Sequence, residues 1–125
     1  MTNAINWFEI PVNDLDRAKQ FYGTVLDGEL SLQPMGEDGT MAILPSQDGV
    51  GGALVKSDSD DWDYTPSQKG SIVYLNGGDD LSVPLGRVET AGGKVLVDKM
   101  GIGENGFVAF FLDTEGNRVG IHSMG

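Results

Sequence analysis

The chain of 125 residues contains no cysteine and only one histidine. The absence of cysteine excludes disulfide bonds, thiolate catalysis and cysteine-ligated zinc. The single histidine, His122, cannot supply both imidazoles of a two-histidine, one-carboxylate metal triad unless two protomers share one site. These two absences remove much of the chemistry that a cavity in this protein could perform.

Positive charge is also scarce. Lysine and arginine together number 8 against 19 aspartates and glutamates, which gives a formal net charge of -11. Such a surface repels phosphate backbones and anionic lipids, so we expect neither nucleic acid nor a membrane as a partner. The main effect of the charge is solubility, with a slight preference for cationic ligands.

Long apolar runs are missing as well. No stretch approaches the roughly 20 residues that a helix needs to cross a bilayer. Residues 1–6 lack the basic segment and following apolar run of a secretory signal. At 39% hydrophobic residues the chain can bury a core of its own. We therefore expect one soluble domain with a cytoplasmic location.

One pattern of secondary-structure elements occurs twice in the chain. In the first half, Asn13 or Asp14 is a natural helix N-cap, and Gly28 is placed to end that helix in a left-handed conformation. In the second half, Pro84 requires the helix to begin near Ser82. The elements predicted from hydrophobic periodicity are strands at residues 5–12, 29–32, 40–44, 51–55, 71–76, 94–97, 106–112 and 117–122, with helices over 15–26 and 82–91.

This order, βαβββ repeated, predicts an α+β fold of two modules at about residues 1–56 and 70–125. A polar, acidic connector at residues 57–69 joins them, and we expect Trp62 and Tyr64 to hold it against the body of the protein. A lid over a pocket is the alternative for this connector. The GxGxxG pattern at residues 101–106 precedes a strand, so it predicts a loop between strands and not a nucleotide site.

Three sequence blocks spread over nearly the whole chain carry a family resemblance. They are residues 11–22 (PVNDLDRAKQFY), 91–95 (AGGKV) and 113–122 (DTEGNRVGIH). In type and order they resemble the vicinal oxygen chelate superfamily, which includes glyoxalases, bleomycin resistance proteins and extradiol dioxygenases. The resemblance implies curved mixed sheets that enclose a cavity, commonly in a homodimer.

The resemblance also implies where a metal would be held. Metal-dependent members place ligands at strand positions that correspond here to Trp7, Gly52 or Ala53, Ser71 and Gly120. None of these side chains is a usual metal ligand, so we expect no cofactor. A shift of two residues along two of the strands would offer Glu9 and His122, which share the faces of Trp7 and Gly120. A divalent metal held by this pair is the alternative.

The candidate pocket combines an apolar wall with two polar points, Glu9 and His122. Glu9 lies midway along a strand and is our candidate catalytic base; an ion pair with Arg118 or Lys94 is the alternative role. Aromatic residues could form the wall or belong to an ordinary core. The candidate pocket residues are Trp7, Glu9, Ser71, Val73, Phe107, Ala109, Phe111, Gly120 and His122.

Three functions remain open on the sequence. The first is a small-molecule-binding protein that buries an apolar or aromatic ligand without a metal. The second is a glyoxalase-like lyase, isomerase or dioxygenase-type enzyme that uses Glu9 as a base, with or without a weakly held divalent metal. The third is a protein whose fold serves assembly alone. Fold does not decide among them.

Overall fold

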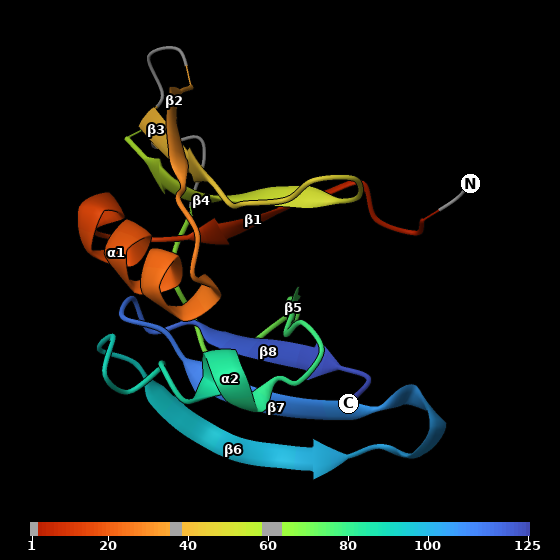
Figure 1. The fold of residues 1–125 in the computed structure, drawn as a ribbon. Coiled ribbons are helices and arrows are strands. Elements are labelled where there is room, and N and C mark those ends of the chain that lie inside the picture. Colours follow the sequence, from red (N-terminus) through yellow and green to blue (C-terminus); the bar gives the residue numbers. More distant parts are fainter. Residues whose placement is uncertain (1–2, 36–38, 59–63) are drawn as a thin grey trace.

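The protein folds into two four-stranded mixed sheets with an α-helix between them (Figure 1). This computed structural model describes residues 3–35, 39–58 and 64–125. The N-terminal sheet has the strand order β1-β4-β3-β2 and the C-terminal sheet the order β5-β8-β7-β6. The elements are β1 (Trp7–Pro11), α1 (Leu15–Leu26), β2 (Ser31–Pro34), β3 (Gly39–Ile43), β4 (Gly51–Ser57), β5 (Tyr74–Asn76), α2 (Ser82–Leu85), β6 (Lys94–Gly101), the 3₁₀ helix η1 (Gly103–Asn105), β7 (Phe107–Leu112) and β8 (Arg118–Ser123).

The two sheets repeat one topology, which confirms the predicted α+β fold of paired βαβββ units. In each sheet the first strand of the module pairs in parallel with the last, and the other pairs are antiparallel. The two modules also share an equivalent backbone hydrogen bond at the end of the first strand. The Val12 amide donates to the Val55 carbonyl at 2.9 Å, and the Gly77 amide donates to the His122 carbonyl at 2.7 Å.

Helix α1 begins and ends where the sequence predicts, but the left-handed residue that follows it comes one position earlier than expected. Asp14 is the N-cap, and its carboxylate accepts the Arg17 amide proton at 3.0 Å. At the other end Asp27, not Gly28, takes the left-handed conformation, with φ of 52°. Aspartate tolerates this conformation better than most residues, since its short polar side chain can bond locally. Gly28 instead permits close packing, because a Cβ there would lie 3.0 Å from Pro45.

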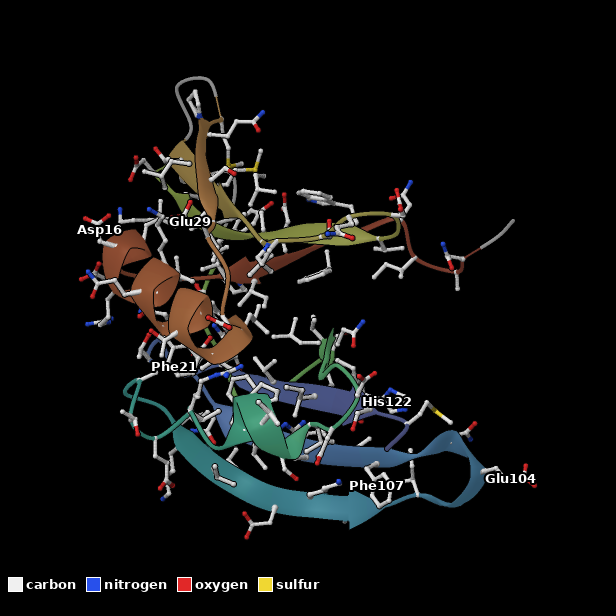
Figure 2. The ribbon with its side chains drawn as sticks, in the orientation of Figure 1. Asp16, Phe21, Glu29, Glu104, Phe107 and His122 are labelled. Carbon is white, nitrogen blue, oxygen red and sulfur yellow. The ribbon has the colours of Figure 1, made fainter. Side chains whose placement is uncertain are left out.

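The hydrophobic core lies between the sheets, around the buried face of α1. Phe21 and Tyr22 on this face meet edge to face, with ring centroids 4.9 Å apart, and Phe111 of β7 lies 5.8 Å from Phe21. Phe21 projects from α1 toward the C-terminal sheet (Figure 2). Its ring also leaves no room for a side chain at Gly93, where a Cβ would lie 2.7 Å from the ring. The core faces of both sheets therefore point inward, and each sheet has an outer face directed away from α1.

The C-terminal module differs from the sequence prediction in the lengths of its elements. Strand β5 has three residues, so Ser71 and Val73 precede it, and β6 continues to Gly101. Helix α2 begins at Ser82, as Pro84 requires, but consists of one turn capped at Gly86. Apolar side chains in and around this segment, Leu81, Leu85 and Val88, are nevertheless buried. The turns around α2 bury these side chains in place of the longer helix predicted over residues 82–91.

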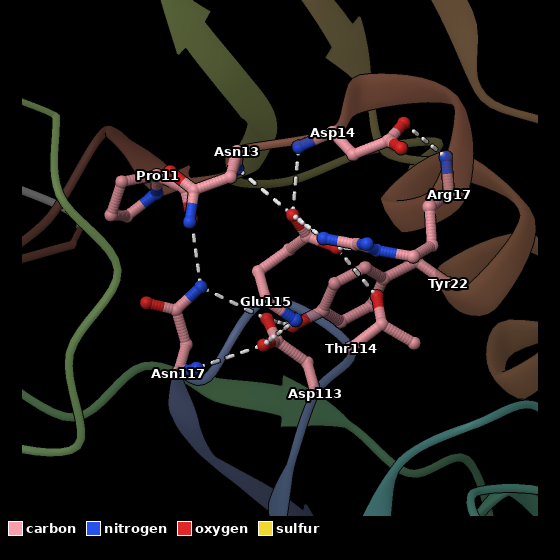
Figure 3. Close-up of polar contacts among 9 residues, drawn as sticks. All are labelled: Pro11, Asn13, Asp14, Arg17, Tyr22, Asp113, Thr114, Glu115 and Asn117. Atoms are coloured by element: carbon pink, nitrogen blue, oxygen red, sulfur yellow. Dashed lines mark hydrogen bonds and ion pairs between the residues drawn. The ribbon is translucent and has the colours of Figure 1, made fainter.

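A carboxylate network joins the β7–β8 turn to the start of α1 (Figure 3). Both oxygens of Glu115 are used. Oε1 accepts the amide protons of Asn13 and Asp14 at 2.9 and 2.8 Å, and Oε2 accepts the Arg17 Nε proton at 2.7 Å. Burial alone would raise the pKa of Glu115, but these hydrogen bonds and one from Thr114 lower it to about 2.

Asp113 forms the second half of this network. Its Oδ1 accepts the amide protons of Glu115 and Asn117 at 2.9 and 2.8 Å, and its Oδ2 accepts the Tyr22 hydroxyl proton at 2.7 Å. Burial first, and then the Asp113 carboxylate, raise the pKa of Tyr22 well above its usual value. The Asn117 side chain continues the network by donating to the Pro11 carbonyl at 2.7 Å. The turn at residues 113–116 between β7 and β8 thus also connects the two modules.

No helix within residues 3–35, 39–58 and 64–125 is long and apolar enough to cross a membrane.

Candidate functional site

A large cavity lies on the outer face of the C-terminal sheet. It has a volume of about 1140 Å³. Its floor comes from alternate residues of three neighbouring strands, Tyr74 on β5, His122 on β8, and Val108 and Phe110 on β7. Met100 and Ile102, at the end of β6, and Met124, after β8, add apolar surface. The cavity lining is therefore mostly apolar, and it also includes polar groups.

Two residues of the predicted apolar wall belong to the core instead. Ala109 and Phe111 are fully buried and lie on the face of the sheet that is directed toward α1. Phe107 packs partly against the same core and carries the Lys99 ammonium 4.5 Å from its ring centre. Because successive residues of a strand point to opposite faces, the cavity receives Val108 and Phe110 in their place.

Tyr74 and Phe110 form an aromatic surface above Gly120. The two ring centroids are 5.7 Å apart. Gly120 is the register partner of both residues, and a Cβ at this glycine would lie 2.6 Å from the Tyr74 ring. Gly120, a candidate pocket residue from the sequence, thus makes room for the Tyr74 ring.

The polar groups of the cavity include His122, Asn76 and Asp79. His122 Nε2 is 2.6 Å from the Asn105 carbonyl oxygen in η1. The Asn76 side-chain oxygen accepts the Gly78 amide proton at 2.9 Å. His122, a candidate pocket residue from the sequence, lines this cavity, whereas Asn76 and Asp79 carried no recognisable motif.

Glu9 lies on the other sheet and does not line this cavity. Its Oε2 accepts the Trp7 Nε1 proton at 3.2 Å, and its Oε1 accepts the Tyr64 hydroxyl proton at 2.5 Å. Hydrogen bonding to Glu9, with smaller effects of burial and of the carboxylate charge, raises the pKa of Tyr64 to about 12. Tyr64 thus fastens the connector to β1, as predicted; Trp62 lies outside the described residues.

A smaller cavity of about 170 Å³ contains Glu9, Ser71 and Val73. Lys69 and Arg118 also border it, but the hydrogen bonds of Glu9 go to Trp7 and Tyr64. The candidate pocket residues therefore do not form one site. Some line the large cavity, some line the small cavity and some belong to the core, while Trp7 lies on the outer face of the N-terminal sheet.

The strand positions that correspond to metal ligands do not fit a metal. A carboxylate or imidazole at position 120 would collide with the Tyr74 ring, and the Trp7 indole packs over Gly51. A side chain at Gly52 would collide with the Phe8 ring. Within the described residues no three histidine, aspartate or glutamate side chains gather as a metal site, and Glu9 and His122 lie on different sheets.

The sequence matches a protein family, and the fold matches solved structures. The profile of the Glyoxalase/Bleomycin resistance protein/Dioxygenase superfamily matches residues 4–121. No curated protein is similar enough in a direct comparison to count as a match.

Among similar solved structures is a glyoxalase/bleomycin resistance protein from Albidiferax ferrireducens T118. It has a TM-score of 0.72 and 15% identity, and the alignment covers 98% of this chain and 100% of that one. A glyoxalase/bleomycin resistance protein from Streptomyces sp. CB03234 has a TM-score of 0.64 and 27% identity, over 95% and 100% of the two chains. TnmS3, an antibiotic binding protein from the same source, has a TM-score of 0.64 and 23% identity, over 100% and 99%.

Proposed function

Because this chain belongs to the glyoxalase/bleomycin resistance protein/dioxygenase superfamily, we propose that it is a small-molecule-binding protein that takes up a planar, apolar ligand without a metal. The ligand would lie in the 1140 Å³ cavity on the outer face of the C-terminal sheet. Its rings would pack against Tyr74 and Phe110, which form the aromatic surface of that cavity.

The observation that carries this proposal is the exposure of large apolar side chains around one cavity. Tyr74, Met100, Ile102 and Met124 are between 41% and 64% exposed, and all four line it. Contiguous apolar surface of this kind is costly in water and marks binding sites in soluble proteins. Methionine side chains adapt their shape to a ligand, which suits such a surface. The antibiotic binding activity of TnmS3 supports the proposal by similarity of fold.

A homodimer is part of the proposal. The cavity is open on the side that faces solvent, and a second copy that packs over it would enclose a ligand on both faces. Burying the exposed apolar groups would also contribute to association. Sedimentation equilibrium of the untagged protein tests this: a concentration-dependent dimer supports the enclosed cavity, and a monomer at all concentrations leaves an open groove as the binding site.

A glyoxalase-like enzyme that uses Glu9 as base is the second candidate. The position of Glu9 beside a small cavity favours it. Both carboxylate oxygens already accept hydrogen bonds, which opposes proton abstraction. In this case Glu9→Gln would abolish turnover with little effect on affinity. Elemental analysis of untagged protein before and after chelation would reveal a divalent metal held at near-stoichiometric amounts.

We expect Tyr74→Ala to weaken the binding of 1-methoxynaphthalene, a neutral aromatic probe, by about 3- to 10-fold, because an aromatic contact contributes roughly 0.5–1.5 kcal/mol beyond its buried area. Equilibrium dialysis measures the affinity. Val83→Ala is the matched control, since Val83 is an exposed apolar residue on α2 outside the cavity. Equal losses in the two variants, or no binding to the wild-type protein, would contradict the proposed function.

A further inference from the structure

The His122 imidazole is held in one tautomer by a backbone carbonyl. A carbonyl oxygen has no proton to give, so the 2.6 Å contact between His122 Nε2 and the Asn105 oxygen requires a proton on Nε2. In the neutral ring, Nδ1 then carries a lone pair and acts as a hydrogen-bond acceptor. Within the described residues no hydrogen bond to Nδ1 is present.

The partner of His122 is itself well fixed. Asn105 ends η1 in the loop between β6 and β7, near the tip marked by Glu104 in Figure 2. The Ile102 amide donates to the Gly106 carbonyl at 2.9 Å and closes this loop. The histidine ring therefore links β8 to the neighbouring hairpin, and its orientation is set before any ligand arrives.

Asn76 supplies a hydrogen-bond donor on the strand next to that of His122. It is the register partner of His122 in the parallel β5–β8 pair, and both residues line the large cavity. Because the Gly78 amide donates to Oδ1, the orientation of the Asn76 amide is defined and its NH₂ group remains as a donor. The hydroxyl group of Ser123, which also lines the cavity, is already used: it accepts the Leu81 amide proton and donates to the Gly125 carbonyl.

One acceptor and one donor on paired strands of the same cavity match a hydroxyl group, which can donate and accept at the same time. We propose that the cavity selects planar aromatic ligands that carry a hydroxyl group, with the hydroxyl proton donated to His122 Nδ1 and the hydroxyl oxygen accepting from the Asn76 amide. The aromatic part lies against Tyr74 and Phe110. This inference rests on the proposed binding function and adds the chemical class of the ligand.

The charge of the cavity favours a ligand with a neutral hydroxyl group over a ligand with a carboxylate. Asp79 lines the same cavity, and the chain has a net charge of -11. A ligand carboxylate would therefore meet a negative potential. A methyl ether would keep the aromatic contacts but would leave the His122 acceptor without a proton donor, and an unpaired polar group in a partly dry site lowers affinity.

The test compares 1-naphthol with 1-methoxynaphthalene by equilibrium dialysis against the untagged wild-type protein. We expect 1-naphthol to bind about 5- to 10-fold more tightly, because one hydrogen bond in a site of this kind contributes about that much. In His122→Phe, which keeps a ring of similar size, the ratio of the two affinities should fall toward unity. Asn76→Leu should weaken the binding of both probes, because the ether oxygen can also accept the amide proton. Equal affinities in the wild-type protein would overturn this inference and leave the proposed function standing. Binding of neither probe would overturn both.

A second measurement does not depend on variants that fold. The chain has one histidine, so its ring nitrogens give unambiguous ¹⁵N NMR signals. We expect the Nε2–H tautomer in the free protein and a change in the Nδ1 signal on addition of 1-naphthol that 1-methoxynaphthalene does not cause. A proton on Nδ1 in the free neutral ring would overturn the inference.

Discussion

Replacing Glu115 by glutamine is expected to lower the free energy of unfolding by about 2–3 kcal/mol. The side chain is fully buried and accepts hydrogen bonds from Arg17, Thr114 and the amides of Asn13 and Asp14. Glutamine keeps the shape but replaces one acceptor oxygen with an NH₂ donor, which would face the Arg17 guanidinium or two amide protons. Two elements that are far apart in sequence would then lose their strongest polar connection. Urea unfolding at neutral pH measures the change.

The pH dependence of stability gives an independent check on Glu115. The folded-state pKa of about 2 is lower than the ordinary value of 4.5. A group with a lowered pKa stabilises the folded state fully above its unfolded pKa, and this stabilisation is lost as the pH falls through the folded pKa. The wild-type protein should therefore lose stability between about pH 4.5 and pH 2, and Glu115→Gln should lose less over the same range.

Glu104→Gln is the matched control for this prediction. Glu104 is exposed in the β6–β7 loop, so the same chemical change should leave the unfolding free energy within about 0.5 kcal/mol of wild type. A Glu115→Gln variant as stable as Glu104→Gln at neutral pH would show that the network in Figure 3 does not hold the modules together.

The repeat of βαβββ could be predicted because local signals agree with the final fold. Hydrophobic periodicity, the Asp14 cap and the breaks between strands each depend on neighbouring residues alone. The family profile and the shared topology of the two sheets confirm this part of the prediction. Element lengths were less predictable. Helix α2 is short because turns bury Val88 as well as a helix would, and the sequence does not distinguish the two.

The Glu115 network escaped prediction for a different reason. Its turn is recognisable from four consecutive residues, but its partners Asn13, Asp14 and Arg17 lie 98 to 102 positions earlier in the chain. A carboxylate in a turn is ordinarily solvated, and only the folded structure shows that this one is buried. The donor next to His122 was missed similarly, since Asn76 reaches it through strand pairing.

The face of β7 could not be assigned from sequence because the strand is apolar throughout. Residues 107–112 read FVAFFL, so alternation gives no contrast between the two faces. The choice depends on which face meets α1, and that contact involves residues about 90 positions apart. The pairing of β6 with β7 is irregular, with register shifts around Val97, so the pattern of β6 does not indicate the face of β7 either. The prediction of a wall containing Ala109 and Phe111 failed at this step.

Phe111→Ala and Phe110→Ala are expected to differ sharply although the residues are adjacent. Phe111 is fully buried against Phe21 and Tyr22, so its truncation should cost about 3–5 kcal/mol of unfolding free energy. Phe110 lies at the cavity floor beside Tyr74, so its truncation should cost less stability and weaken 1-methoxynaphthalene binding. Urea unfolding and equilibrium dialysis, the latter under conditions where both variants are folded, separate the two effects.

The reverse pattern, with Phe111→Ala losing affinity at little cost in stability, would place the cavity on the face of β7 that now meets α1. It would restore the wall expected from sequence and contradict the position of the binding site. The same result would also remove His122 from that site, because His122 shares the outer face with Phe110 and Gly120 through the β7–β8 pairing. One pair of neighbouring phenylalanines therefore tests which face of the C-terminal sheet binds ligand, independently of the identity of that ligand.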